Sequence, residues 1–237
     1  MTVITFRIIT NTTGTILTAQ VRKSNTIWIF IPILGSLVFI SLYIIAAFLY
    51  PGGSETDKAS VGYSLTNNYW CNLLHDIAIN GKPNTAKPIA VTAMIILCLA
   101  LSAFWFCIPR LIVTGKPLGV TIQFSGVSAM LCSFLLLTNI DHDLAVNLAS
   151  SLGFIATIGT LICLYHTKWY GLFAFGLVNI VLIGLNNYLY YTKGMMIYLP
   201  VVQKISFLSF LVWICCINMN IYQRSVRVFK EQKYLKQ

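Results

Sequence analysis

The sequence predicts an all-α protein, a polytopic bundle of six transmembrane helices with both termini in the cytoplasm. Of the 237 residues, 57% are hydrophobic and only 9% are charged, which leaves too little polar surface to cover a water-facing globule. The apolar residues also gather into uncharged stretches of about 20 residues, the length that crosses about 30 Å of hydrocarbon. Most of this chain is therefore expected to lie in lipid.

Six such stretches follow one another along the chain, at 27–50, 89–108, 119–140, 144–165, 170–191 and 198–222. The links between the later stretches have only a few residues, so consecutive helices should pack as antiparallel neighbours in one domain over 27–222. A cytoplasmic N-terminal tail, 1–26, precedes this domain, and a basic cytoplasmic tail, 223–237, follows it.

The charges predict the orientation. With the N-terminus inside, the inner segments hold eleven basic residues against Glu231 alone, a net charge of +10, whereas the outer segments hold five lysines and five acids. Basic residues are retained on the cytoplasmic side during insertion, so we expect a multi-pass protein of the inner (plasma) membrane. The inner basic residues are spread over short segments without interleaved aromatics, which favours anionic lipids at the cytoplasmic face as partners over nucleic acid.

The outer loop, 51–88, is long enough to be functional or structured. Leu65, Tyr69, Leu73 and Ile77 recur at four-residue steps, which predicts an amphipathic helix lying along the outer interface. A surface lid without chemistry explains the same pattern equally well.

Polar side chains near the outer boundary predict a ligand pocket, because polar groups in hydrocarbon cost free energy unless they pair. The residues that share this depth are Asn68, Asn72, Asp76, Asp141, Asn147, Asn186, Gln203 and Lys204. Lys204 lies one turn inside the boundary, where its ammonium should either pair with Asp141 or Asp143 or extend to the headgroups. The small residues within the spans should let helices approach closely; they are Gly126, Ser128, Ser133, Gly153, Gly159 and Gly176.

A second interpretation of the outer face is catalytic. Asp141 and His142, together with His75 and Asp76, could act as acid/base or metal groups of a membrane-embedded hydrolase or lipid-modifying enzyme. The spacing matches no metal motif, and a short polar turn between two helices also explains the Asp-His-Asp run. We therefore predict no metal and no cofactor, and whether a reaction is catalysed stays open.

Several short motifs resemble a known family. The chain reads Tyr50-Pro51-Gly52-Gly53, then Gly62-Tyr63-Ser64, a segment from Asn67 to Leu73, and Asn80-Gly81-Lys82-Pro83-Asn84. These motifs, with Asp141-His142 and Gln203-Lys204, resemble the DUF998 group of bacterial six-span proteins, which is distantly similar to the Frag1/DRAM/Sfk1 proteins. The likeness covers about residues 27–222, and the chain has Asn72 where members often carry Asp. It implies a lipid-related or membrane-organising role and no established reaction.

Together these observations predict an integral membrane protein that binds a lipid headgroup or a small polar ligand in an outward-facing pocket, or that acts as an accessory membrane subunit. Aromatic residues on the lipid-facing helix surfaces could also contact a protein subunit or a second copy of the chain. The enzyme described above is the alternative.

Overall fold

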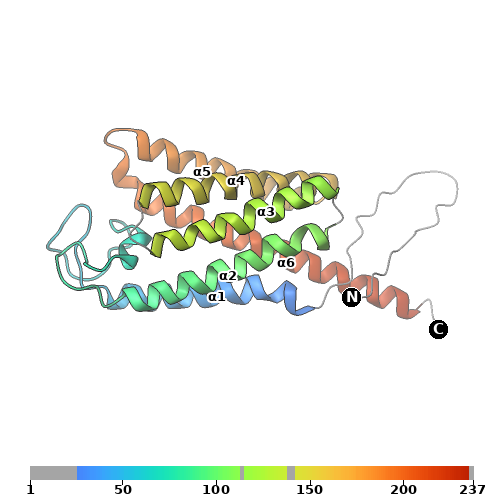
Figure 1. The fold of residues 1–237 in the computed structure, drawn as a ribbon, viewed down its shortest axis with the longest axis horizontal. Coiled ribbons are helices and arrows are strands. Elements are labelled where there is room, and N and C mark those ends of the chain that lie inside the picture. Colours follow the sequence, from blue (N-terminus) through green and yellow to red (C-terminus); the bar gives the residue numbers. More distant parts are fainter. Residues whose placement is uncertain (1–25, 113–114, 138–141, 235–237) are drawn as a thin grey trace.

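The computed structural model describes residues 26–112, 115–137 and 142–234, and this part of the chain is helical apart from its loops. Six α-helices run along the long axis of the molecule (Figure 1). Their bounds are α1 Thr26–Leu49, α2 Lys87–Leu111, α3 Lys116–Ser133, α4 His142–His166, α5 Tyr170–Tyr191 and α6 Leu199–Tyr234. Three short 3-10 helices accompany them, at Trp70–Leu74, Phe134–Leu137 and Met196–Tyr198.

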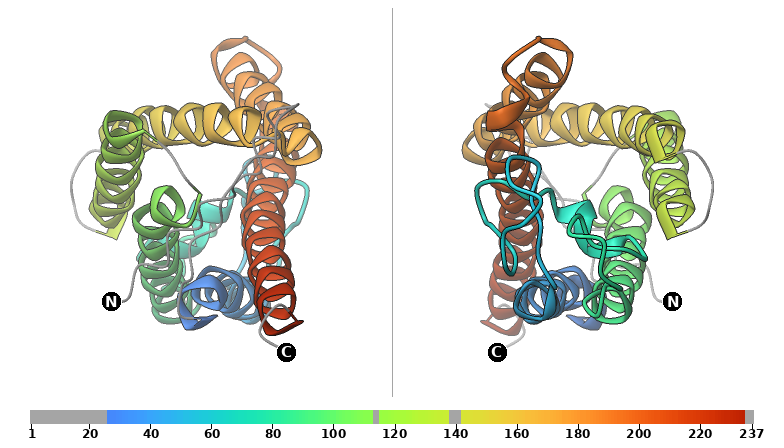
Figure 2. Two further views of the ribbon diagram at one scale, coloured as in Figure 1. Left: turned by 90° about the vertical axis from the view of Figure 1, so that its right-hand side faces the viewer. Right: turned by 90° about the vertical axis from the view of Figure 1, so that its left-hand side faces the viewer.

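The six helices form a closed ring in chain order. Each packs against the next along the chain, and α6 packs against α1. Figure 2 views the bundle from its two ends and shows α1 and α2 on one side of the ring and α4 and α5 on the other. Short connections between long helices favour this antiparallel arrangement of sequence neighbours.

Five of the helices are long and apolar enough to cross a membrane, which indicates a multi-pass membrane protein. These stretches are Ile27–Leu49, Lys87–Leu111, Asp143–His166, Tyr170–Tyr191 and Met196–Arg227. Helices suit this solvent because each satisfies its own backbone hydrogen bonds where no water is present. The third expected span, 119–140, corresponds to α3 with its 3-10 extension to Leu137, and its last three residues lie outside the described part of the chain.

Glycines allow the close helix contacts that the sequence predicted. A Cβ built on Gly126 would lie 2.2 Å from Trp105, one on Gly159 would lie 2.6 Å from Ile122, and one on Gly176 would lie 2.4 Å from Leu161. At Gly35, which the sequence analysis did not single out, the Cβ of Ala100 would be 2.2 Å away. Gly153 is less constrained, with Ala129 at 3.8 Å.

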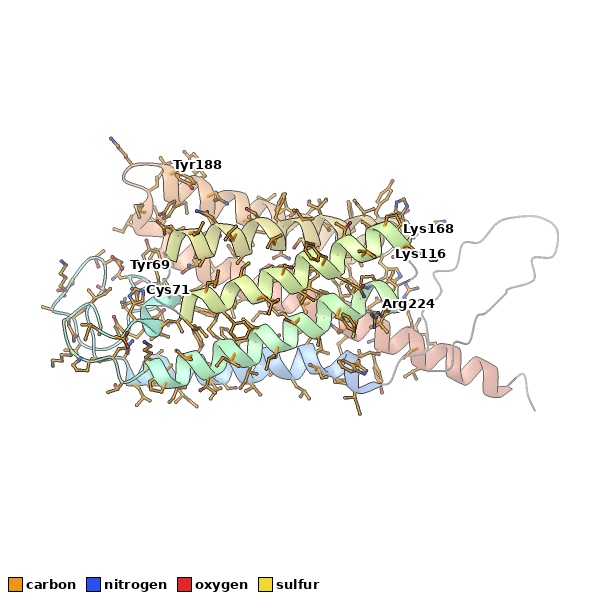
Figure 3. The ribbon with its side chains drawn as sticks, in the orientation of Figure 1. Tyr69, Cys71, Lys116, Lys168, Tyr188 and Arg224 are labelled. Atoms are coloured by element: carbon orange, nitrogen blue, oxygen red, sulfur yellow. The ribbon has the colours of Figure 1, made fainter. Side chains whose placement is uncertain are left out.

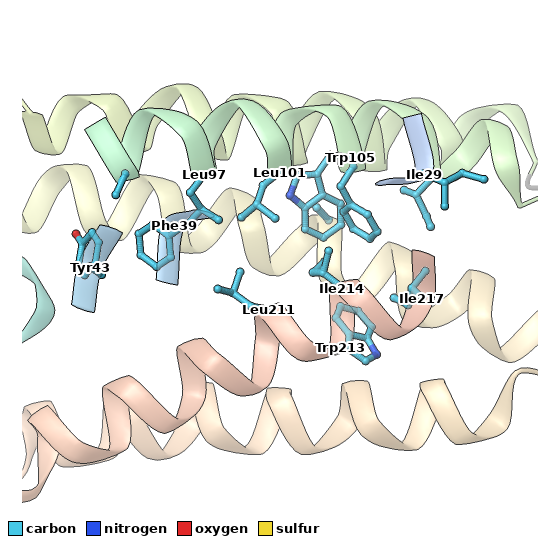
Figure 4. Close-up of a cluster of buried hydrophobic side chains, with 14 of the residues drawn as sticks. Ile29, Phe39, Tyr43, Leu97, Leu101, Trp105, Leu211, Trp213, Ile214 and Ile217 are labelled. Atoms are coloured by element: carbon cyan, nitrogen blue, oxygen red, sulfur yellow. The ribbon is translucent and has the colours of Figure 1, made fainter. Parts of the chain in front are cut away.

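The core lies between α1, α2 and α6, where the side chains shown in Figure 4 interdigitate. Its largest members are Trp105, Trp213, Phe39 and Phe104, all 1% exposed or less. The indole of Trp213 donates a hydrogen bond across to the Leu172 carbonyl of α5 at 2.8 Å. The aromatic core therefore packs α6 against α1 and α2, and this hydrogen bond joins α6 to α5.

One expectation for the elements is wrong. The amphipathic helix expected over residues 65–77 is replaced by the single 3-10 helix Trp70–Leu74, because asparagine side chains in this segment take up backbone groups that a helix would need. The helix α6 is longer than the expected sixth span, 198–222, and continues to Tyr234. The polar residues that end the apolar stretch, chiefly Gln, Arg, Lys and Glu, are good helix formers, so the helix outlasts the hydrophobic signal.

Candidate functional site

The loop between α1 and α2 folds into a compact cap at one end of the bundle. Its first turn uses Gly52 and Gly53, whose φ angles are +130° and +84°. A Cβ would lie 2.3 Å from the Ser60 carbonyl oxygen at Gly52 and 2.4 Å from the Asn80 nitrogen at Gly53. Both glycines are therefore required by the backbone conformation and by the packing of the cap.

Buried asparagines hold this cap together. The Asn68 amide donates to the Gly53 carbonyl at 2.8 Å, and its oxygen accepts from the Ser64 N–H at 2.8 Å. Asn84 donates to three carbonyls, those of Asn72, Leu73 and His75, at 3.2, 3.2 and 2.9 Å. Side-chain amides thus supply the backbone hydrogen bonds that a sheet or helix would supply elsewhere.

Lys204 ties the cap to α6. Its ammonium donates hydrogen bonds to the Asn68 carbonyl and, at 3.0 Å, to the Pro200 carbonyl. The side chain is only 8% exposed, and its nitrogen lies 5.5 Å from the centre of the Tyr63 ring. The Tyr63 hydroxyl donates to the same Asn68 carbonyl at 3.3 Å. The Asn68 carbonyl therefore accepts hydrogen bonds from both the Lys204 ammonium and the Tyr63 hydroxyl.

The neighbouring residue reinforces this junction. Gln203 accepts from the Trp70 N–H at 3.5 Å, and the Trp70 ring packs against Tyr43 and Phe207 with centroids 5.2 and 5.1 Å away. The 3-10 helix of the cap is thereby docked between α1 and α6. Trp70 is half-buried in this cluster.

The structure brings together four of the eight predicted pocket residues, Asn68, Asn72, Gln203 and Lys204. Asn72 accepts from the Tyr69 N–H at 2.5 Å and donates to a Glu55 carboxylate oxygen at 3.4 Å. Asn72 belongs to the same 3-10 helix as Trp70, whose N–H donates to Gln203, so it adjoins the contact between the cap and α6.

Three of the other predicted residues do not join this group. Asp76 pairs with Lys87 at 2.5 Å beside the start of α2, and Asn147 is exposed on α4. Asn186 of α5 donates to Ser206 at 2.5 Å, but Ser206 lies about 200° around α6 from Lys204. Asp141 is outside the described residues.

The partners that the structure gives Lys204 are main-chain carbonyls, whereas the sequence analysis expected a carboxylate. Main-chain carbonyls accept its hydrogen bonds, and within the described ranges the ion pair present is Lys87 with Asp76. Asp143 accepts from the Tyr190 hydroxyl at 3.5 Å. Pairing with Asp141 stays a prediction, because that residue is outside the described part.

The catalytic alternative also remains untested. Asp141 and the side chain of His142 fall outside what the structure describes, while the His75 carbonyl accepts one of the Asn84 hydrogen bonds. In the described portion of the chain, no three His, Cys, Asp or Glu side chains are grouped as a metal site would need.

Sequence reasoning missed three residues that organise the junction: Gly53, Tyr63 and Asn84. Nothing in the local sequence pattern around Asn84 indicates that its amide reaches three carbonyls. The thiol of Cys71 lies in the same cap, where burial raises its pKa to about 11, and burial likewise raises the pKa of the Tyr63 phenol. Both groups are therefore protonated and uncharged near neutral pH.

The two ends of the bundle differ in charge. Figure 3 shows Tyr69 and Cys71 at the end that carries the cap, whereas Lys116, Lys168 and Arg224 lie at the opposite end. There the Arg224 guanidinium lies 4.6 Å from the centre of the Trp169 ring and donates to Asn220 at 2.8 Å.

Comparison with known proteins adds no family to this geometry. No protein-family model matches the chain, and neither a curated protein nor a solved structure is significantly similar to it.

Proposed function

We propose that this chain is a six-span protein of the plasma membrane, with both termini in the cytoplasm and the cap on the outer side. The sixth span is α3 with its 3-10 extension, the 22 residues from Lys116 to Leu137, which at about 1.5 Å per residue reach about 33 Å. That length matches a hydrocarbon core of about 30 Å. The basic residues at the end opposite the cap support the orientation.

We further propose that the junction between the cap and α6 binds a small anionic group, such as the phosphate of a lipid headgroup. The observation that carries this proposal is the buried ammonium of Lys204. An ammonium has three N–H donors, and two of them reach main-chain carbonyls.

A buried charge at the edge of a membrane is costly unless an opposite charge or several dipoles compensate it. Here two carbonyl dipoles and the face of the Tyr63 ring provide partial compensation. An anion that accepts the third N–H would supply the missing negative charge. The hydrogen-bonded cap around Asn68 would hold the binding site in its bound geometry before the anion arrives.

The test compares Lys204→Met with Lys193→Met, a control at another outer lysine, which is exposed. Each protein is placed in nanodiscs of phosphatidylcholine, with or without phosphatidylglycerol, and its thermal unfolding is recorded. Inorganic phosphate and glycerol phosphate are added in parallel to distinguish a free anion from a lipid headgroup.

A bound anion stabilises the folded state in proportion to its occupancy. We therefore expect the anion-dependent rise in melting temperature in the wild type and in Lys193→Met, and its loss in Lys204→Met. Lys204→Met will also melt lower in phosphatidylcholine alone, because the cap loses its contact with α6. If the anion-dependent rise persists in Lys204→Met, or is missing from the wild type, the lysine only holds the cap and the proposal is wrong.

A further inference from the structure

A groove on the membrane-facing surface lies between α2 and α3, far from the cap junction. It has a volume of about 420 Å³, and its lining includes Phe106 of α2 and Val120, Phe124 and Leu131 of α3. These four side chains are 42%, 63%, 72% and 60% exposed. Apart from Gln123 and one serine the lining is apolar, so it suits a hydrocarbon ligand.

The length of the groove corresponds to one leaflet. From Val120 to Leu131 the helix advances about 16 Å, at about 1.5 Å per residue, which is about half of a hydrocarbon core of about 30 Å. Val120 lies one turn after Lys116, the first residue of α3. The groove therefore begins beside the basic end of the bundle and runs towards the middle of the membrane.

Two basic side chains flank that end of the groove. The Arg110 guanidinium lies 3.8 Å from the centre of the Phe106 ring, so its charge is held against a side chain that itself lines the groove. Lys116 stands at the start of α3, and both basic residues are exposed. Within the groove, Gln123 donates to the Phe106 carbonyl at 2.6 Å and ties the two helices together.

We propose that this groove binds an anionic phospholipid of the inner leaflet, with one acyl chain along Val120 to Leu131 and the phosphate between Arg110 and Lys116. An arginine and a lysine on one side of a lipid-facing groove complement a phosphate in charge and in hydrogen-bond donors. The exposed apolar walls complement a chain that is already dissolved in the same hydrocarbon. This site is separate from the Lys204 junction and does not depend on it.

The experiment titrates delipidated wild-type protein with phosphatidylglycerol or phosphatidylcholine of the same chain length and counts bound lipids by native mass spectrometry. Arg110→Gln/Lys116→Gln removes the charges, and its control is Lys168→Gln/Arg227→Gln, two exposed basic residues at the same end. Val120→Trp blocks the groove, and its control is Val181→Trp, at a 69% exposed position of α5. Melting curves confirm that each surface variant is folded.

We expect Arg110→Gln/Lys116→Gln to bind phosphatidylglycerol about 25-fold more weakly, since each basic side chain near an anionic lipid contributes roughly fivefold. Val120→Trp should lose both lipids, both control proteins should bind as the wild type does, and glycerol phosphate should not compete.

The proposal is overturned if Lys168→Gln/Arg227→Gln weakens binding equally, which would mean a general charge attraction. It is also overturned if Val120→Trp binds normally, or if Val120→Trp instead abolishes a dimer, which would mean that a second copy fills the groove. Neither result bears on the anion at Lys204.

Discussion

At the scale of single residues, the asparagines of the cap show how one side chain can fit two different interpretations. Asn68, Asn72 and Asn84 are all buried and all bind the backbone of the cap. In the sequence, an asparagine at the membrane boundary has the same donors and acceptor whether it meets a ligand or a carbonyl. The ligand role predicted for Asn68 and Asn72 has to accommodate these backbone hydrogen bonds.

Replacing Asn84 should destabilise the cap strongly. Asn84→Ala removes the amide NH2 whose two N–H groups are shared among three carbonyls, and the oxygen that accepts from the Ala86 N–H. Buried groups left without partners cost about 1 to 3 kcal/mol each. We expect a loss of about 3 kcal/mol and faster proteolysis within residues 50–86. Thermal melting and limited proteolysis measure these effects. Asn147→Ala, at an exposed position on α4, should change stability by less than about 0.5 kcal/mol; equal effects of the two substitutions would contradict this account of the cap.

At the scale of elements, the helices follow from the sequence and the cap does not. Apolar stretches of membrane length predict helices because lipid leaves the backbone no other partner. The end of α6 could not be predicted in this way, since the charged residues after Tyr222 end the hydropathy signal without ending the helix. The four-residue recurrence from Leu65 to Ile77 suggested a helix. Instead, the Asn72 side chain accepts from the Tyr69 N–H at the start of a 3-10 helix that begins at Trp70 and ends at Leu74. Contacts between side chains and the backbone, or between distant parts of the chain, leave no periodic pattern in the sequence from which they could be predicted.

The contact between α2 and α3 gives a test at this scale. Gly126→Ala places a Cβ 2.2 Å from the buried Trp105 ring, so either the indole or the whole of α3 must move. Overpacking of this kind costs about 1 to 3 kcal/mol, and we expect a melting temperature several degrees lower than that of the wild type. The matched control is Gly184→Ala in α5, where a Cβ meets nothing within 4 Å. A loss of stability in Gly184→Ala as large as in Gly126→Ala would mean that helix packing is not the cause.

At the scale of the whole molecule, hydropathy predicts depth but not position around the ring. Gln203, Lys204 and the cap meet because α6 presents both side chains towards the loop. Asn147 has the depth expected of a pocket residue, yet it is exposed on α4. The seven predicted pocket residues that the structure describes therefore separate into one junction and several other positions, which only the packing of the helices decides.

The same scale gives the test of topology. Lys58→Cys places a thiol in the exposed part of the cap, and Lys168→Cys places one in the exposed turn before α5. In intact cells, a membrane-impermeant maleimide should label Lys58→Cys above the wild-type background and should label Lys168→Cys only after lysis. We expect this result because basic residues are retained on the cytoplasmic side of the membrane. If Lys168→Cys alone were labelled in intact cells, the orientation would be the opposite of the one proposed.

The length of α6 has a consequence for how the two ends of the molecule are connected. Its 36 residues extend about 54 Å at about 1.5 Å per residue, well beyond a hydrocarbon core of about 30 Å. One unbroken helix joins the Lys204 contact at the cap to the opposite end of the bundle, where Arg224 lies (Figure 3). The cap and the basic end are therefore linked through a single element, with no loop between them.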